Sequence, residues 1–245
     1  MLNLIQIEFL KLRRRKFVWL MLLATLFMPF LTLLYFRRVS GPDADPVQFY
    51  KMAAFSYSLW LILPVVLGML CTMLMYDENQ YHMMGQFWIV PVSKMGYIFS
   101  KFFVALFYSI CFMLITVAAS VIFGALSGCI TFQWGSVIWL FRKCMEAGII
   151  TPFVMLPILA VAASQKGYIL PVCATLVYTF LGFILMMVNM YLHPLSSMEV
   201  LLMRNGDIPG VVLNQAINVP LAFSCICVWD IAAILLADIA LRKRA

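Results

Sequence analysis

The chain alternates long apolar stretches with short polar segments. A helix needs roughly 20 apolar residues to cross the ~30 Å hydrocarbon core of a bilayer. Stretches of about this length recur along the chain, so we predict an all-α membrane protein in which residues 1–245 form a single transmembrane domain. The predicted spans cover approximately residues 17–36, 56–76, 99–126, 146–163, 168–192 and 219–241.

A short amphipathic segment precedes the first span. Its apolar residues recur at intervals of three and four, which predicts a helix with one apolar face. These residues are Leu2, Ile5, Phe9 and Leu12. The basic run at residues 13–16 follows directly and favours contact with anionic headgroups. We therefore expect an interfacial helix that lies on the membrane surface, with membrane lipid as a partner.

The fourth apolar stretch is interrupted by charges, which cost several kcal/mol at the centre of a bilayer. The charged residues are Arg142, Lys143 and Glu146. We therefore predict a short interfacial helix over Trp134–Phe141 and a separate span that begins near Glu146. Pro152 and Pro157 should kink that span, because proline lacks a backbone donor and clashes with the preceding turn.

Residues 192–220, between the last two spans, are too many for a turn and too apolar for a solvated loop. We expect two short re-entrant or interfacial helices, the first capped by Ser196 or Ser197 and ended by Gly206. Broken helices at membrane depth require other helices to cover the free backbone. An ordinary outer loop with an apolar patch is the alternative.

Composition supports a membrane location, with 65% hydrophobic and 11% charged residues. The net charge of +7 is carried at the edges of apolar segments, which favours a membrane surface over nucleic acid as the partner. Six spans return both termini to one side, and that side carries most of the 17 Lys and Arg residues. The positive-inside rule then predicts that both termini are cytoplasmic.

Neither catalytic nor metal-binding residues are expected in this chain. The seven cysteines fall mainly inside apolar stretches and form no Cys-x-x-Cys pair, so we interpret them as small apolar side chains. His82 and His193 are the only histidines, and neither has a visible catalytic companion. We expect no cofactor bound by this chain.

The connection between the second and third spans carries more specific sequence than a linker needs. Asp77 and Glu78 favour a helix N-terminus, and Pro91 forces the preceding residue out of the helical region. A separate helix over about residues 78–89 is therefore predicted. Its apolar face suits a partner groove and is formed by Met83, Met84, Phe87 and Trp88.

This connection resembles that of ABC type-2 transporter permeases, in which an acidic residue ends one span, a glycine follows, and Pro-x-Ser-Arg/Lys with a later Lys opens the next. The residues at these positions are Glu78, Gly85, Pro91, Ser93, Lys94 and Lys101. Residues 8–13, the chain length and the span count are also similar, whereas Gln86 stands where many of these permeases carry threonine. Over its whole length the chain looks most like the small permeases of bacterial lantibiotic-immunity and bacitracin-resistance exporters.

The resemblance implies a permease of the bacterial cytoplasmic membrane that exports peptide antibiotics. It also implies two copies of a separate ATPase subunit, which would bind ATP and Mg, and a second permease, homologous or identical. The sequence agrees, because it contains no Gly-x-x-x-x-Gly-Lys-Ser/Thr phosphate loop. The residues expected to couple the permease to its ATPase are Asp77, Glu78, Gly85, Phe87, Trp88, Pro91, Ser93, Lys94 and Lys101.

Asp230 lies near the centre of the last span, where an ionised carboxylate requires a partner or water. It either forms a hydrogen bond between helices or lines a substrate path, to which Glu146 and Asn189 could also contribute. Other functions remain open: an ABC permease for a different hydrophobic substrate or lipid, a secondary transporter or channel, and an intramembrane enzyme. The last two require more intramembrane charges or clustered His and acidic residues than this chain offers.

Overall fold

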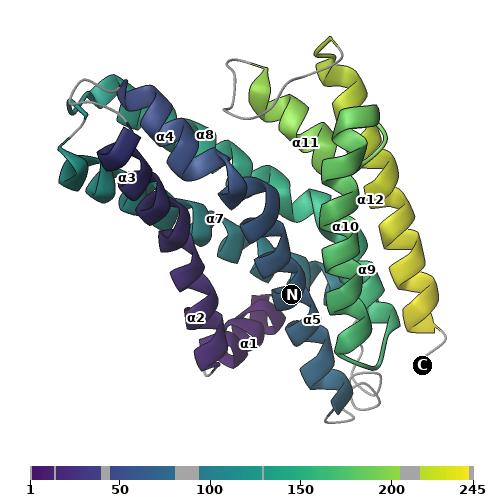
Figure 1. Ribbon diagram of the computed structural model, residues 1–245. Coiled ribbons are helices and arrows are strands. Elements are labelled where there is room, and N and C mark those ends of the chain that lie inside the picture. Colours follow the sequence, from purple (N-terminus) through teal and green to yellow (C-terminus); the bar gives the residue numbers. More distant parts are fainter. Residues whose placement is uncertain are drawn as a thin grey trace.

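The computed structural model describes residues 2–13, 15–39, 45–80, 94–128, 130–204 and 216–242. Within these ranges the chain forms helices joined by short turns, with no strand (Figure 1). Six of the described segments are long and apolar enough to cross a membrane, which confirms the predicted six-span, all-helical architecture. These segments are Lys16–Val39, Pro46–Glu78, Met95–Ser127, Trp134–Ser164, Ile169–Val188 and Val219–Leu241.

The N-terminal helix α1 (Leu2–Arg13) lies across one end of the bundle, near the start of α2 (Lys16–Leu23) and the end of α5 (Leu63–Gln80) (Figure 1). We call this end the α1 side. The first span runs away from it through α2, a 3₁₀ turn at Ala24–Leu26 and α3 (Phe27–Val39). The position of α1 across the foot of a span fits the predicted interfacial helix.

The second span begins earlier than predicted, with helix α4 (Pro46–Phe55). The Asp45 side chain caps this helix by accepting a hydrogen bond from the Val47 backbone N–H at 3.0 Å, and Pro46 suits its first turn. A π-helical turn at Ser58–Ile62 then leads into α5 (Leu63–Gln80). Sequence periodicity did not separate α4 from the preceding connection.

Each of the first, second and fourth spans departs from regular α-helix next to a proline. The 3₁₀ turn precedes Pro29, the π-helical turn precedes Pro64, and the fourth span breaks at Met155, between Pro152 and Pro157. Proline removes one backbone hydrogen bond and clashes with the carbonyl four residues earlier, so the helix changes its winding there. The predicted kink in the fourth span is confirmed.

The third span is helix α7 (Lys94–Ser127), and the fourth is α8 (Trp134–Val154) followed by α9 (Leu156–Ser164). The structure differs from the prediction here, because α8 continues through Phe141 instead of ending there. The Lys143 Nζ donates a hydrogen bond to the Leu202 carbonyl at 2.6 Å. A guanidinium nitrogen of Arg204 lies 2.7 Å from Glu146 Oε1. These charges have partners within the protein, so the helix need not break to expose them.

The C-terminal part consists of α10 (Ile169–Val188), the short α11 (Pro194–Met203) and α12 (Val219–Arg242). All ten residues of α11 are buried, and α8, α10 and α12 contact it. We call its end of the bundle the α11 side. The first of the two expected short helices is thus present and covered, while Gly206 and the second lie outside the described residues.

The cap of α11 differs from the prediction. The His193 side chain accepts a hydrogen bond from the Leu195 backbone N–H at 3.2 Å, and Pro194 occupies the first turn. The hydroxyls of Ser196 and Ser197 donate to the carbonyls of His193 and Met190 instead. A ring nitrogen acts as the capping acceptor, and the serines fix the turn that leads into the helix.

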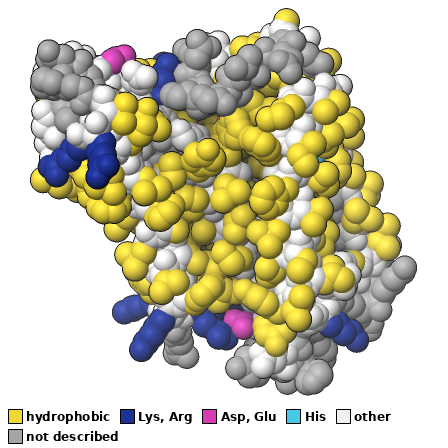
Figure 2. Space-filling view, in the orientation of Figure 1, with side chains coloured by type: hydrophobic (Ala, Val, Ile, Leu, Met, Phe, Trp, Pro, Cys, Tyr) yellow, Lys and Arg dark blue, Asp and Glu magenta, His cyan; other side chains and the backbone are white. Residues whose placement is uncertain are grey.

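The outer surface of the bundle is largely apolar, and charged side chains gather towards its two ends (Figure 2). Large hydrophobic side chains are exposed along α2, α10 and α12. Only 22% of the most apolar window of the last span is buried within the chain. A surface of this kind suits lipid rather than water as solvent.

Candidate functional site

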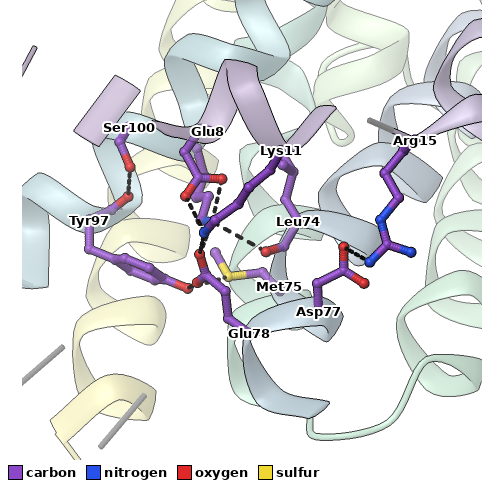
Figure 3. A network of polar contacts seen from close by, with 10 residues as sticks. Glu8, Lys11, Arg15, Leu74, Met75, Asp77, Glu78, Tyr97 and Ser100 are labelled. Atoms are coloured by element: carbon purple, nitrogen blue, oxygen red, sulfur yellow. Dashed lines mark hydrogen bonds and ion pairs between the residues drawn. The ribbon is translucent and has the colours of Figure 1, made fainter. Parts of the chain in front are cut away.

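Helix α1 brings charged side chains against the feet of the second and third spans. Its residues Phe9 and Leu12 pack on the hydrophobic core, and the Phe9 ring meets Phe107 of α7 edge to face, with centroids 5.0 Å apart. Glu8 and Lys11 lie on the face that turns towards α5 and α7 (Figure 3). The apolar contacts thus hold an acidic and a basic group at the end of the bundle.

These residues form a buried ion cluster with Glu78 of α5 and Lys101 of α7. The Lys101 Nζ lies 2.5 Å from Glu78 Oε1 and 2.7 Å from Glu8 Oε2. It also donates to the Leu74 carbonyl at 3.3 Å. The Lys101 side chain is 0% exposed, so each of its charge-assisted contacts is shielded from water.

Lys11 completes the ion cluster from the α1 helix. Its Nζ lies 2.7 Å from Glu78 Oε1 and 3.1 Å from Glu8 Oε1. The Tyr97 hydroxyl donates a hydrogen bond to Glu78 Oε2. The centroid of the Tyr97 ring lies 5.2 Å from the Lys101 Nζ. Two carboxylates and two ammonium groups thereby balance in a largely buried volume (Figure 3).

Electrostatics favour the charged form of Lys11. Burial alone would lower the pKa of its ammonium, but the hydrogen bond and charge of Glu78, together with Glu8, outweigh that effect and raise the pKa above its ordinary value. A second ion pair lies at the edge of the ion cluster, where Arg15 and Asp77 approach to 2.9 Å (Figure 3). The Lys11–Glu78 contact and the Arg15–Asp77 pair both connect the N-terminal segment to the last turns of α5.

The structure therefore brings together three of the predicted coupling residues, Asp77, Glu78 and Lys101. Glu78 and Asp77 lie in the last turns of α5 rather than at the start of a separate helix, because α5 continues to Gln80. Lys94 begins α7. The other predicted positions lie outside the described residues: Gly85, Phe87, Trp88, Pro91 and Ser93.

Sequence reasoning missed the contribution of α1 to this site. The amphipathic pattern predicted a helix on the membrane surface and gave no protein partner for Glu8, Lys11 or Arg15. Glu8 and Lys11 are three residues apart and so share one face of α1, which was the available signal, whereas Arg15 follows the end of that helix. Tyr97 gave no signal of its own, since a tyrosine in the first turns of an apolar helix is ordinary interfacial sequence.

The residues proposed to line a substrate path do not form one site. Glu146 pairs with Arg204 at 2.7 Å and with Lys143 at 3.7 Å, and so joins α8 to the end of α11. The Asn189 side chain accepts a hydrogen bond from the Tyr191 backbone N–H at 3.0 Å in the turn after α10. Both residues have structural partners on the α11 side.

Asp230 has a different environment from these two residues. It lines a cavity of about 150 Å³ with apolar neighbours that include Phe102, Phe153 and Leu156. Its Oδ1 is buried and has no hydrogen-bond partner among the described residues. The structure thus provides no helix-to-helix hydrogen bond for this oxygen, and it places the carboxylate beside an open space.

Glu199 is an unexpected acidic residue inside the protein. It belongs to α11, outside the six spans, and is 4% exposed. Neither carboxylate oxygen meets a hydrogen-bond partner in the described chain, although the nearby Trp60 indole favours the charged form. Burial nevertheless raises its pKa to about 8. The adjoining cavity of about 20 Å³ has room for roughly one water molecule.

The described residues contain no group of three or more His, Cys, Asp or Glu side chains that could hold a metal ion. His193 has structural contacts, since its ring packs at a tilt against Tyr178 with centroids 4.3 Å apart and its side chain caps α11. Burial lowers its pKa to about 4. The charges of the ion cluster are paired with one another and join α1, α5 and α7.

Comparison with known protein families matches residues 4–182 to the family described as ABC-2 family transporter protein. No curated protein matches the sequence. The matched region begins within α1, ends within α10 and includes the whole ion cluster. This family forms the membrane component of ABC transporters, and membership implies partnership with an ABC ATPase. With six apolar spans and a family match over most of its length, the chain belongs to the ABC-2 family and is a transmembrane ABC transporter permease.

Proposed function

We propose that this permease belongs to an ATP-driven exporter that removes lantibiotic or bacitracin-like peptide antibiotics from the bacterial cytoplasmic membrane. The whole-chain resemblance to small immunity and resistance permeases supports the substrate class. Two copies of an ABC ATPase would bind ATP and Mg and supply the energy. A second permease, homologous or identical, would complete the membrane part.

The observation that carries the coupling part of this proposal is the buried ion cluster. Glu78, in the last turn of α5, and Lys101, in the first turns of α7, flank the connection over residues 81–93. This connection resembles the ATPase-contacting segment of ABC-2 permeases. Glu8 and Lys11 join α1 to the same point. A displacement of that connection would therefore act on α1, α5 and α7 together.

In this mechanism, ATP binding closes the ATPase subunits and shifts the permease between two arrangements. The ion cluster keeps the feet of α5 and α7 together while they move, because separating its charges in a buried environment is costly. The α1 side is accordingly the cytoplasmic side, with both termini there. The larger number of basic residues on that side supports this orientation.

Within the membrane, we assign Asp230 to the substrate path, because it borders a cavity and its buried oxygen lacks a described partner. Glu146 and Asn189 do not line this path in our proposal. They act on it indirectly, because Glu146 holds α8 against the end of α11 and Asn189 fixes the turn after α10. A cationic or hydrogen-bonding group of a peptide substrate could satisfy the Asp230 carboxylate.

The coupling segment is tested by replacing Phe87 and Trp88 with serine. The purified variant should insert and keep its thermal stability but lose substrate-stimulated ATPase activity and export, because the apolar face needed by the partner groove is gone. Replacement of the exposed Trp134, on the α11 side, provides the matched control. Unchanged stimulation and export in the Phe87/Trp88 variant would refute this role.

The substrate class is tested by growth inhibition of cells with and without the transporter. We expect higher resistance to lantibiotics or bacitracin and unchanged sensitivity to hydrophilic antibiotics with intracellular targets. Unaltered resistance to every membrane-active peptide, together with lipid-stimulated ATPase activity in vesicles, would favour a lipid or another hydrophobic molecule as the substrate.

A further inference from the structure

A groove of about 310 Å³ opens between α1, α2 and α7, where α1 contributes Phe9, Leu12 and Arg13 to its lining. Its walls are apolar and include Leu12 from α1, Leu22 from α2 and Ile115 from α7. The Tyr108 hydroxyl, which also lines the groove, already donates to the Val18 carbonyl at 3.0 Å. The interior therefore suits a hydrocarbon chain.

The rim of the groove is open to the bilayer. Trp19 is 62% exposed and Phe107 is 54% exposed, and both line the opening. These aromatic side chains lie at the α1 side, close to the level at which the first span begins. An aromatic ring at this depth can pack on acyl chains near the headgroup boundary.

The mouth of the groove is basic. Arg13 is the only charged residue in the described lining, and it is exposed. Lys16, at the start of α2, is also exposed nearby. The neighbouring carboxylates cannot neutralise this edge, because Glu8 is bound to Lys11 and Lys101, and Asp77 is bound to Arg15. Figure 2 shows basic side chains below the apolar surface at this end.

We propose that this groove binds one anionic phospholipid from the leaflet on the α1 side, with an acyl chain between Trp19 and Phe107 and its headgroup phosphate on Arg13. A lipid with a net negative head matches both the apolar interior and the uncompensated cations. A second copy of this chain would present another apolar helix and would leave Arg13 without an anion.

This site would also stabilise the ion cluster indirectly. Helix α1 contributes to both places, with Phe9 and Leu12 in the groove and Glu8 and Lys11 in the ion cluster. A bound acyl chain would fill the space beneath α1 and hold it against α7. The inference concerns lipid binding and does not depend on which substrate the transporter exports.

The test is native mass spectrometry of the full-length chain purified in mild detergent and titrated with phosphatidylglycerol or phosphatidylcholine. We expect each chain to retain one phosphatidylglycerol molecule tightly and to bind phosphatidylcholine more weakly. Arg13→Gln should weaken phosphatidylglycerol binding about fivefold, as expected for one basic residue at a membrane surface. Arg38→Gln, an exposed arginine at the other end of the same span, is the matched control and should leave binding unchanged.

A groove-filling variant, Ile115→Trp, distinguishes the acyl-chain site from general attraction to the surface. It should reduce retention of both lipids while Arg13→Gln affects mainly the anionic one. Equal retention of the two lipids by the unmodified chain, or equal effects of Arg13→Gln and Arg38→Gln, would overturn the proposal. Cross-linking of two chains through cysteines placed at Trp19 would overturn it as well, since a second copy would then cover the groove.

Discussion

Replacing Lys101 with methionine removes the central cation of the ion cluster and leaves its two carboxylates close together. Lys101 contacts Glu78 at 2.5 Å and Glu8 at 2.7 Å from a fully buried position. Removing one partner of a buried ion pair typically costs about 3–5 kcal/mol, because the remaining charge stays buried without compensation. We expect a destabilisation of this size.

For a chain of this length, 1 kcal/mol corresponds to roughly 2–4 °C in the unfolding midpoint. Lys101→Met should therefore lower the apparent Tm by about 6–20 °C. The assay is thermal unfolding of purified protein in one detergent, followed by tryptophan fluorescence at a fixed scan rate, because unfolding of such proteins is often irreversible. Lys166→Met is the control, since Lys166 is exposed.

The double variant Glu78→Gln/Lys101→Met tests the origin of this loss. Removing one carboxylate along with the ammonium leaves less uncompensated charge, so the double variant should be more stable than the sum of the two single losses predicts. The reasoning is refuted if Lys101→Met lowers the Tm no more than Lys166→Met. Strict additivity of the two single variants would refute it equally.

Three further predictions concern residues away from the ion cluster. Burial raises the pKa of Glu199 to about 8 from an ordinary value near 4.5, so the folded protein keeps this side chain protonated over a range where the unfolded chain loses the proton. The free energy of unfolding should therefore fall as the pH rises between these two values, by up to about 1.4 kcal/mol per pH unit. Glu199→Gln should flatten the dependence of apparent Tm on pH, and an unchanged slope would contradict the assignment. Gly68→Ala should lower the free energy of unfolding by about 1–3 kcal/mol, because the added Cβ would lie 2.1 Å from a Thr175 methyl, whereas Gly167→Ala has open space and should be neutral. Asp230→Ala should insert with unchanged Tm but lose transport in vesicles, and a loss of folded protein would instead favour a structural role.

The architecture was predictable from sequence where hydropathy decides it. Each of the six spans overlaps its predicted range, since about 20 apolar residues can hardly lie elsewhere than in a bilayer. The helix over residues 46–55 was missed, because its burial depends on packing against α3, α7 and α8 rather than on its own pattern. The expected division of the fourth stretch failed for a related reason. Partners for Lys143 and Glu146 come from α11, about 60 residues later in the chain.

The candidate site was predictable in part. The family pattern singled out Glu78 and Lys101, but it did not reveal that the two side chains pair. Their partners Glu8 and Lys11 come from a helix that is about 70 residues away from Glu78 in sequence. An amphipathic pattern identifies the apolar face of such a helix and leaves its polar face assigned to water. Only the fold shows that part of the polar face is buried.

The account rests on the claim that this permease is driven by a separate ABC ATPase through its α1 side. The most direct measurement is affinity purification of the tagged chain from its native membrane in mild detergent, with subunit ratios determined by quantitative mass spectrometry. The account predicts an ABC ATPase in a one-to-one ratio with permease chains, and its loss from the Phe87/Trp88 variant but not from the Trp134 control. Purification of the intact permease without any ATPase, under conditions that preserve other membrane complexes, would contradict it.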